Sequence, residues 1–140
     1  MKQITEDYVS FEVAKLLKEK EFDELCFALY NPEEELIQCG VKLSNTQVGR
    51  VPGSYSAPTH QMAFKWLRKV HKIILDIAFE ANQGWTFYIG HLITKTLSDG
   101  STIIVDVQHS VWSEDVQQPY YKEYEQAVEA ALKYTLENLI

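Results

Sequence analysis

Two runs of alternating apolar and polar residues, joined by a short turn sequence, constrain the fold of this chain more than any other feature. The alternating positions are Ile73, Leu75, Ile77, Phe79 and Ala81 in the first run, and Trp85, Phe87, Ile89, His91 and Ile93 in the second. A period of two is typical of a strand with one buried face. The turn between the runs, Asn82-Gln83-Gly84, ends in a glycine, which readily adopts the left-handed conformation of a three-residue hairpin loop. The sequence therefore predicts a β-hairpin.

The length of each turn also predicts which residues face each other across the strands. A second glycine-closed turn, Ser98-Asp99-Gly100, leads into a third alternating run that starts at Ile103. The predicted cross-strand pairs are Phe79 with Phe87, Leu75 with His91, Ile93 with Val105, and His91 with Val107. This register places the apolar rows of all three strands on one face, with Phe79, Phe87 and Ile93 in the core.

Helices and two further strands are expected around this meander. The helices are expected from the Thr5-Glu6-Asp7 segment to about Lys20, from the cap residue Thr59 to about Lys72, and from about Tyr121 to Asn138. Strands are expected over residues 25–30 and 37–43, a long loop over 44–58 and an irregular connector over 111–119. The predicted fold class is α+β: an antiparallel β-meander of three or more strands, with helices packed chiefly on one face, in a single domain of residues 1–140.

Composition narrows the classes of partner. The net charge is −7, which disfavours binding to nucleic acid and to anionic membranes, and we find no signal segment and no apolar run long enough to cross a bilayer. The acidic residues between Tyr120 and Glu125 would repel phosphate at the position where double-stranded RNA-binding domains are basic. Cys26 and Cys39 do not make a disulfide framework, and Cys26 lies in an apolar run typical of a core residue. A cytoplasmic location is expected.

Two histidines are the candidates for chemistry. The predicted register places His91 and His109 diagonally on one face of neighbouring strands, where two imidazoles can begin a zinc or nickel site. Further ligands are missing, because Asp106 is predicted to point to the other face. Buried histidines that bond to the backbone or to a hydroxyl are the alternative interpretation. The sequence also contains no catalytic motif with recognisable spacing, so we expect no cofactor and no catalytic residue.

The face of the meander opposite Phe87 is mixed in character rather than polar. Its predicted apolar and aromatic residues are Ile74, Tyr88, Leu92 and Ile104, among Asp76, Glu80, Thr86 and Asp106. One wet face is the rule for antiparallel sheets, so these four residues predict a binding patch unless residues 25–43 cover them.

Three segments carry a resemblance to a known group of proteins. They are ITEDYVSFEVAKLLKEK (residues 4–20), APTHQMAFKWLR (57–68) and YEQAVEAALKYTLENLI (124–140). In these segments the chain resembles small uncharacterised proteins encoded in phage and prophage-like regions of gut bacteria; residues 31–55 lie outside the resemblance. The resemblance implies an origin in a mobile element and an intracellular setting, and no mechanism.

Together these features predict a non-catalytic binding or accessory protein of phage-like origin, which acts through contacts with a protein partner or with a second copy in a homodimer. Two alternatives remain open. One is a small metal-dependent or hydrolytic enzyme that uses His91 and His109. The other is an acidic decoy of nucleic-acid-binding proteins, suggested by the net charge and by the acidic run Glu33-Glu34-Glu35.

Overall fold

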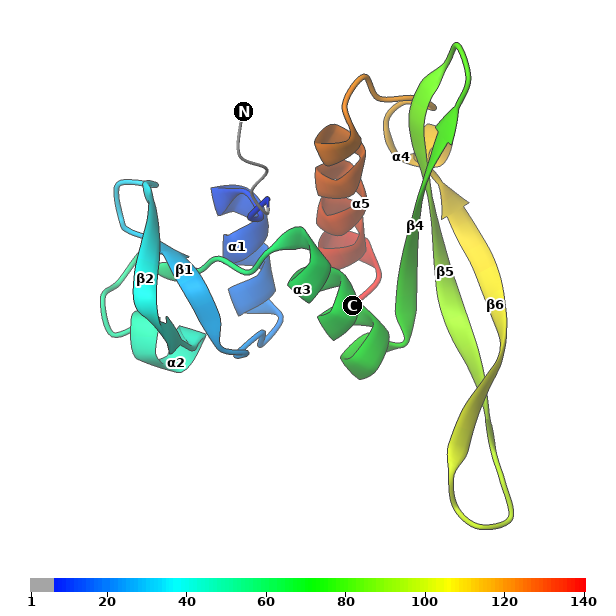
Figure 1. Ribbon diagram of the computed structural model, residues 1–140, viewed down its shortest axis with the longest axis horizontal. Helices are drawn as coiled ribbons and strands as arrows, with labels where there is room; N and C mark the ends of the chain where they lie inside the picture. The colour runs from blue at the N-terminus through cyan, green and yellow to red at the C-terminus, as the bar shows by residue number, and fades with distance from the viewer. Residues whose placement is uncertain (1–6) are drawn as a thin grey trace. The chain divides into compact units, whose positions relative to one another are not determined.

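The chain has an α+β fold with two antiparallel three-stranded sheets, as the computed structural model of residues 7–140 shows (Figure 1). The backbone divides into two compact units, which are described separately. The N-terminal unit comprises the residues up to Ala63 together with Leu136–Ile140, and the C-terminal unit comprises Phe64–Thr135. Helix α3 (His60–Trp66) starts in the first unit and ends in the second.

The N-terminal unit is a small sheet of order β2-β1-β3 packed with helix α1. Its elements are α1 (Phe11–Glu19), β1 (Cys26–Tyr30), β2 (Leu36–Leu43), α2 (Asn45–Val48) and β3 (Tyr55–Ser56). The two predicted strands are thus confirmed. The predicted loop over residues 44–58 is wrong in part, because it contains α2 and β3. Neither short element has the length at which periodicity identifies a helix or a strand.

Helix α1 begins later than predicted. Its cap is Ser10, whose hydroxyl accepts a hydrogen bond from Val13 N at 3.2 Å. The preceding residues are extended instead, because Val9 N donates to Pro58 O at 3.0 Å and Tyr8 forms a bridge with Thr59. The predicted start at Thr5 and Glu6 lies outside the described residues.

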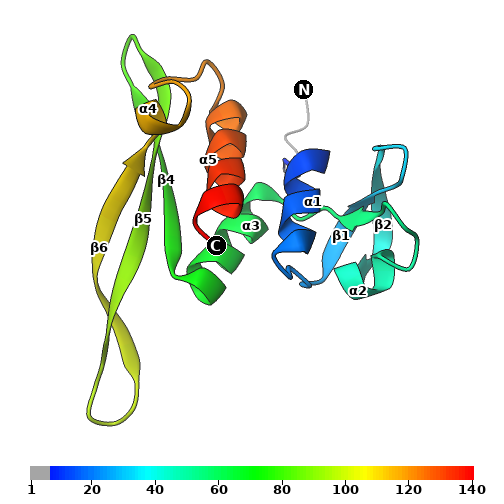
Figure 2. The same cartoon turned by 180° about the vertical axis from the view of Figure 1, so that it is seen from behind.

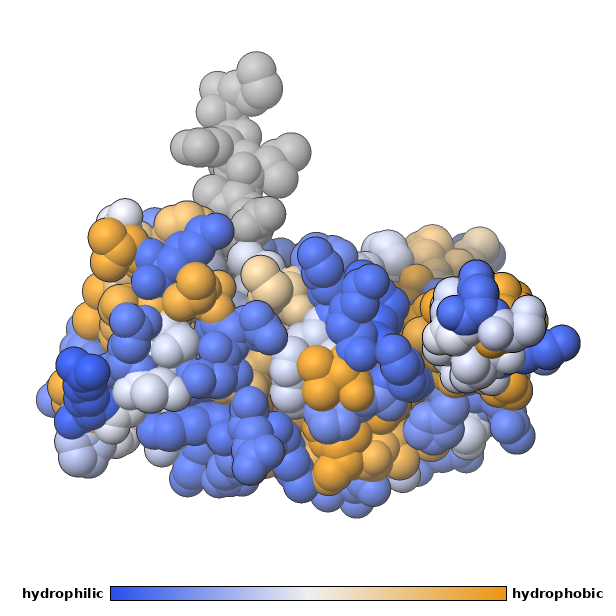
Figure 3. Space-filling model, turned by 90° about the horizontal axis from the view of Figure 1, so that it is seen from below, coloured by the Kyte–Doolittle hydropathy of each residue, from blue (hydrophilic) through white to orange (hydrophobic). Residues whose placement is uncertain are grey.

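One face of the N-terminal sheet is buried and the other is exposed. Cys26 and Ala28 are buried, which confirms the prediction that Cys26 is a core residue, while the intervening Phe27 points outward, with Lys42 Nζ 5.1 Å from the centre of its ring. Figure 3 shows hydrophobic side chains on the surface of this unit, at the left of the view. The exposed hydrophobic residues of this unit include Leu25, Phe27, Leu36, Ile37, Val41 and Val51.

The C-terminal unit contains the predicted meander. Its elements are the end of α3, a π-helical segment (Leu67–His71), β4 (Ile73–Glu80), β5 (Gly84–Thr96), β6 (Thr102–Trp112), α4 (Ser113–Val116) and α5 (Tyr124–Asn138). The strand order β4-β5-β6 confirms an antiparallel meander. Figures 1 and 2 show α5 running alongside the sheet. One face of the sheet is buried, and its core residues are Ile73, Leu75, Phe87 and Ile89. We call it the Ile89 face.

The start of helix α3 and the apolar side of helix α5 also agree with the sequence pattern. Met62 N donates to Thr59 Oγ1 at 3.2 Å, so Thr59 caps α3 as predicted. The buried positions of α5 within the C-terminal unit have the expected helical spacing: Ala127, Val128, Ala131, Leu132 and Thr135.

The register of the first hairpin differs from the prediction by two residues. Phe79 lies opposite Trp85 rather than Phe87, and Ile73 lies opposite His91. The loop is tightened by a hydrogen bond from Gln83 N to Glu80 O, and both Asn82 and Gly84 have positive φ. A shift of two residues keeps every side chain on its predicted face, so the pattern could not distinguish the two registers. The shift leaves Phe79 near the end of the sheet, where its side chain is 60% exposed instead of buried.

The second hairpin follows the predicted register near its turn and departs from it further along. Thr94 lies opposite Ile104 as predicted, but irregularities between Ile93 and Thr94 and between Ile89 and Gly90 each move the pairing by one residue. The predicted pair of Ile93 with Val105 is therefore wrong. Ile93 is 40% exposed rather than buried, and Val105 is exposed as well. Leu92 N still donates to Lys72 O at 2.8 Å, just before β4. Beyond Leu92, β5 pairs with β6 alone, so the end of this hairpin is a two-stranded arm (Figure 1).

The segment expected to be an irregular connector is partly ordered. Strand β6 continues to Trp112, and Ser113–Val116 forms the short helix α4. Asp115 Oδ2 accepts a hydrogen bond of 3.1 Å from Trp112 N, which ties the end of the strand to the start of this helix. This segment closes over one end of the sheet and builds the pocket described below.

Candidate functional site

The four residues of the predicted patch lie on one face of the C-terminal sheet. Ile74, Tyr88 and Leu92 alternate with the buried Ile89-face residues along β4 and β5, and Ile104 lies opposite Thr94. The predicted pair of Ile74 with Leu92 is wrong, because Ile74 lies opposite Gly90. We call this side the Tyr88 face. Ile104 is 61% exposed on it, and the other three residues are half-buried.

The two candidate histidines lie on opposite faces of the sheet, which corrects their predicted proximity. His91 lies opposite Gln108, whereas His109 lies opposite Gly90 and so points to the Tyr88 face. There, His109 Nε2 is 4.0 Å from Asp76 Oδ2. The irregularity between Ile93 and Thr94 causes this change, since it moves β6 by a single residue relative to β5 before His109 is reached. Within residues 7–140, no three histidine, cysteine, aspartate or glutamate side chains come together as metal ligands.

A pocket of about 150 Å³ opens at the end of the Tyr88 face where α4 closes over the sheet. Strands β4, β5 and β6, helix α4 and the segment before α5 all contribute to it. Its lining residues are Glu80, Thr86, Tyr88, Trp112, Ser113, Glu114, Pro119 and Tyr120. We call it the Glu80 pocket. Both charged side chains in this lining are carboxylates, and three of the lining residues are aromatic.

The pocket depends on a close approach of backbone at Gly84. Trp85 and Tyr121 exchange two backbone hydrogen bonds of 2.7 and 2.8 Å, which hold the segment before α5 against the start of β5. A Cβ on Gly84 would lie 2.6 Å from Tyr121 O, and the φ angle of this glycine is +126°. Because Gly84 has no side chain, Tyr121 can lie against β5. The hydroxyl of the neighbouring Tyr120 donates a hydrogen bond of 2.6 Å to Glu80 Oε2.

Two aromatic rings meet at a right angle in the pocket. The ring centres of Tyr88 and Trp112 are 4.4 Å apart with an interplanar angle of 89°. Burial raises the pKa of Tyr88, and the charges of Glu80 and Asp76 and a hydrogen bond to Glu80 add to this shift. The Trp112 side chain is 47% exposed, so it forms an accessible wall of the pocket. Edge-to-face geometry of this kind is a favourable arrangement of aromatic side chains.

A buried chain of hydroxyl groups supports the floor of the pocket. Ser113 Oγ donates to Pro119 O at 2.7 Å, and Thr86 Oγ1 lies 2.7 Å from Ser113 Oγ. Because the hydroxyl hydrogen of Ser113 is already engaged, Thr86 is the donor in the second bond. Thr86 and Ser113 are both buried, so these bonds fix α4 and the following segment on the sheet.

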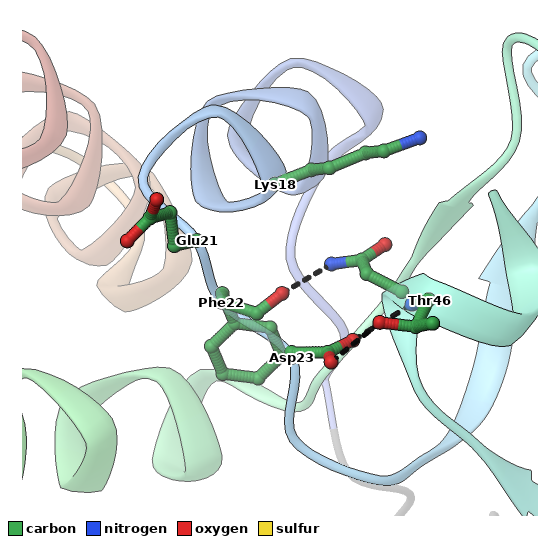
Figure 4. Close-up of a pocket in the computed structure, with 6 residues that line it drawn as sticks. Lys18, Glu21, Phe22, Asp23 and Thr46 are labelled. Atoms are coloured by element: carbon green, nitrogen blue, oxygen red, sulfur yellow. Dashed lines mark hydrogen bonds between the residues drawn. The ribbon is translucent and has the colours of Figure 1, made fainter.

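A second cavity, of about 350 Å³, lies in the N-terminal unit (Figure 4). Its central polar groups are engaged within the fold. Both carboxylate oxygens of Asp23 accept hydrogen bonds from Thr46, and Asn45 donates to Phe22 O at 2.7 Å and accepts from Ser56 N at 2.8 Å. Figure 4 shows Lys18 and Glu21 extending away from each other. This cavity is therefore a structural junction and not a set of convergent binding groups.

The sequence placed Tyr88, Glu80 and Thr86 on one face of the meander, as the structure does, but it did not reveal Trp112, Glu114 and Tyr120 as members of the same site. Trp112 and Glu114 belong to the segment expected to be an irregular connector. The available signal was the density of aromatic and acidic residues between Trp112 and Tyr120.

Comparison with protein-family models, with curated proteins and with solved structures finds no match for this chain. None of the helices in residues 7–140 combines the length and apolar character needed to cross a membrane.

Proposed function

We propose that this chain is a non-catalytic binding protein that contacts a partner protein through the Tyr88 face of its C-terminal sheet. The observation that carries the proposal is the exposure of Trp112 and Ile104 on a face that also presents the charged residue Asp76. Tryptophan and tyrosine are enriched among the residues that dominate the energy of protein interfaces. The resemblance of residues 4–20, 57–68 and 124–140 supports placing this role in a phage-like genome.

The alternatives have less support from the structure. His91 and His109 lie on opposite faces, so this pair gives no support to a metal-dependent hydrolase. The acidic run Glu33–Glu35 forms a turn in which Asn31 Oδ1 accepts hydrogen bonds from Glu33 N and Glu35 N, as expected for an exposed turn. The acidic decoy remains a prediction from charge alone.

The proposal is tested by comparing two exposed aromatic residues on opposite faces of one sheet. Immobilised wild type, Trp112→Ala and Phe79→Ala proteins are incubated with bacterial lysate, and the retained proteins are quantified by mass spectrometry. We expect a partner retained by wild type and Phe79→Ala and lost by Trp112→Ala. Light scattering over a range of concentrations shows whether that partner is a second copy. Equal retention of every lysate protein by wild type and by both variants would contradict the proposal.

A further inference from the structure

We propose that the Glu80 pocket binds the ammonium group of a lysine side chain. This inference rests on the proposed function, because it names the group that the partner protein inserts. Three properties of the pocket favour this ligand: its size, its charge, and the hydrogen-bonding state of its polar atoms.

The size of the pocket restricts what can enter. Its volume of about 150 Å³ is well below the several hundred Å³ of sites that enclose a whole small-molecule ligand. It is large enough for the end of one side chain. A side chain that belongs to a partner docked on the Tyr88 face fits this restriction.

The charged and aromatic side chains of the lining select a cation. Glu80 and Glu114 are the two charged residues among those that line the pocket. The perpendicular rings of Tyr88 and Trp112 form two adjoining walls, and Tyr120 adds a third aromatic side chain. Aromatic faces attract ammonium groups through the ring quadrupole, and cages of several rings are a known way to recognise alkylated ammonium groups.

The internal hydrogen bonds of the pocket leave mainly acceptors for a ligand. The hydroxyl hydrogens of Tyr120, Ser113 and Thr86 are donated to Glu80, Pro119 O and Ser113, respectively. What these groups still offer are oxygen lone pairs, together with the free oxygens of the carboxylates. An ammonium group has three donors and no acceptor, so it complements this lining, whereas an anion would find like charge.

The test compares a charged probe with its uncharged counterpart. The probes are Nα-acetyl-lysine N-methylamide and the 2-aminoheptanoic acid analogue, in which a methyl group replaces the ammonium group. Binding is followed through the indole N–H signal of Trp112 in NMR spectra, identified with the Trp112→Phe variant. We expect dissociation constants on the order of millimolar for such a small ligand. Attraction to the rings and carboxylates is expected to make the lysine probe bind about fivefold tighter than the analogue.

Matched charge variants complete the test. Glu80→Gln and Glu114→Gln are each expected to reduce the preference for the charged probe, and the Glu114 variant leaves the bond between Tyr120 and Glu80 intact. Glu33→Gln removes the same charge from an exposed turn outside the pocket and should leave the preference unchanged. Equal affinity of the two probes, or a preference that both pocket variants leave unchanged, would overturn the inference. If the lysine probe fails to bind while Trp112→Ala still loses its partner, the inference fails and the proposed function stands.

Discussion

Tyr120 and Glu80, which are 40 residues apart in the sequence, are joined by a hydrogen bond of 2.6 Å from the Tyr120 hydroxyl to Glu80 Oε2. This bond raises the pKa of Tyr120 above its ordinary value of 10.0, with smaller contributions from burial and from the charge of Glu80. The raised pKa means that the folded state favours the protonated hydroxyl. The contribution of this hydrogen bond to the free energy of unfolding is therefore complete below pH 10, and it is lost as the pH rises through the pKa of Tyr120 in the folded state.

Tyr120→Phe is accordingly expected to lower the free energy of unfolding at pH 7, because Glu80 Oε2 loses the hydrogen bond of 2.6 Å from the Tyr120 hydroxyl. Urea denaturation of both proteins at pH 7 and pH 11 checks the prediction. The difference between wild type and variant should shrink at the higher pH, where the tyrosine of the unfolded chain is ionised. A difference that stays constant between the two pH values would show that the bond does not act as described.

Gly84→Ala is expected to destabilise the protein and to disrupt the Glu80 pocket. The new Cβ would lie 2.6 Å from Tyr121 O, and the residue has a φ angle of +126°. We expect a loss of about 2 kcal/mol or more in the free energy of unfolding, measured by urea denaturation. Gly40→Ala is the control, since nothing lies within 4 Å of a Cβ at that position. Equal effects of the two substitutions would contradict the role given to Gly84.

Tyr121→Phe is expected to change the free energy of unfolding in the opposite direction from Tyr120→Phe. The buried hydroxyl of Tyr121 has no hydrogen-bond partner among residues 7–140, while its ring stacks on Phe87 at 6.1 Å. Removing an unpaired buried hydroxyl while keeping the ring is expected to raise the free energy of unfolding by about 1 kcal/mol. Thermal denaturation of the two variants side by side provides the measurement. A lower melting temperature for Tyr121→Phe would show that the hydroxyl has a partner in solution.

Asp23→Ala is expected to destabilise the N-terminal unit at neutral pH. Asp23 accepts hydrogen bonds from Thr46 N and Oγ1 at 2.7 and 2.6 Å, so it caps α2 from a distant position in the sequence. Loss of a cap typically costs about 1 kcal/mol. These bonds from Thr46 lower the pKa of Asp23 below 3.8, so its stabilisation is present above pH 3.8 and is lost as the pH falls through the folded-state pKa. The melting temperatures of wild type and Asp23→Ala should therefore differ at pH 7 and converge near pH 2. A difference that persists at pH 2 would show that the ionised Asp23 carboxylate is not the source of the stabilisation.

The two cysteines are expected to react at different rates with iodoacetamide at pH 8. Burial raises the pKa of Cys26 to about 11, and its side chain is nearly inaccessible. Cys39 is half-buried. Because the thiolate is the reactive species, modification should begin at Cys39, as followed by mass spectrometry of peptides. Faster labelling of Cys26 would mean that the first strand opens readily.

The faces of β4 and β5 were predictable from sequence, but the pairing of these two strands was not. Alternation assigns Phe87 and Ile89 to the core and Tyr88 to the other side, and the structure agrees. A register shift of two residues preserves that alternation, so only the turn could fix the pairing. Both Asn82 and Gly84 tolerate positive φ, and the sequence alone does not decide between their alternative turns.

The irregular pairing of β5 with β6 limited how much of the candidate site could be predicted from the sequence. Gly90 fits at one irregularity, because a Cβ there would lie 2.9 Å from Gln108 O and 3.1 Å from His109 Cδ2. Single-residue offsets of this kind leave no trace in an alternating pattern, so the face of His109 could not be predicted. The Glu80 pocket was missed for a different reason. Its walls come from separate segments, which only the pairing of Trp85 with Tyr121 brings together.

The arm formed by β5 and β6 beyond Leu92 is free to change over evolutionary time more than the packed part of the sheet. Its residues are held by one neighbouring strand, and most of them are exposed on both sides. Opening such an arm costs only a local free energy and leaves the packed Ile89 face intact. Insertions, deletions and substitutions near Gly100 are therefore expected to have little effect on global stability. Natural variation can remodel the tip of the arm while the packed part of the C-terminal unit keeps its fold.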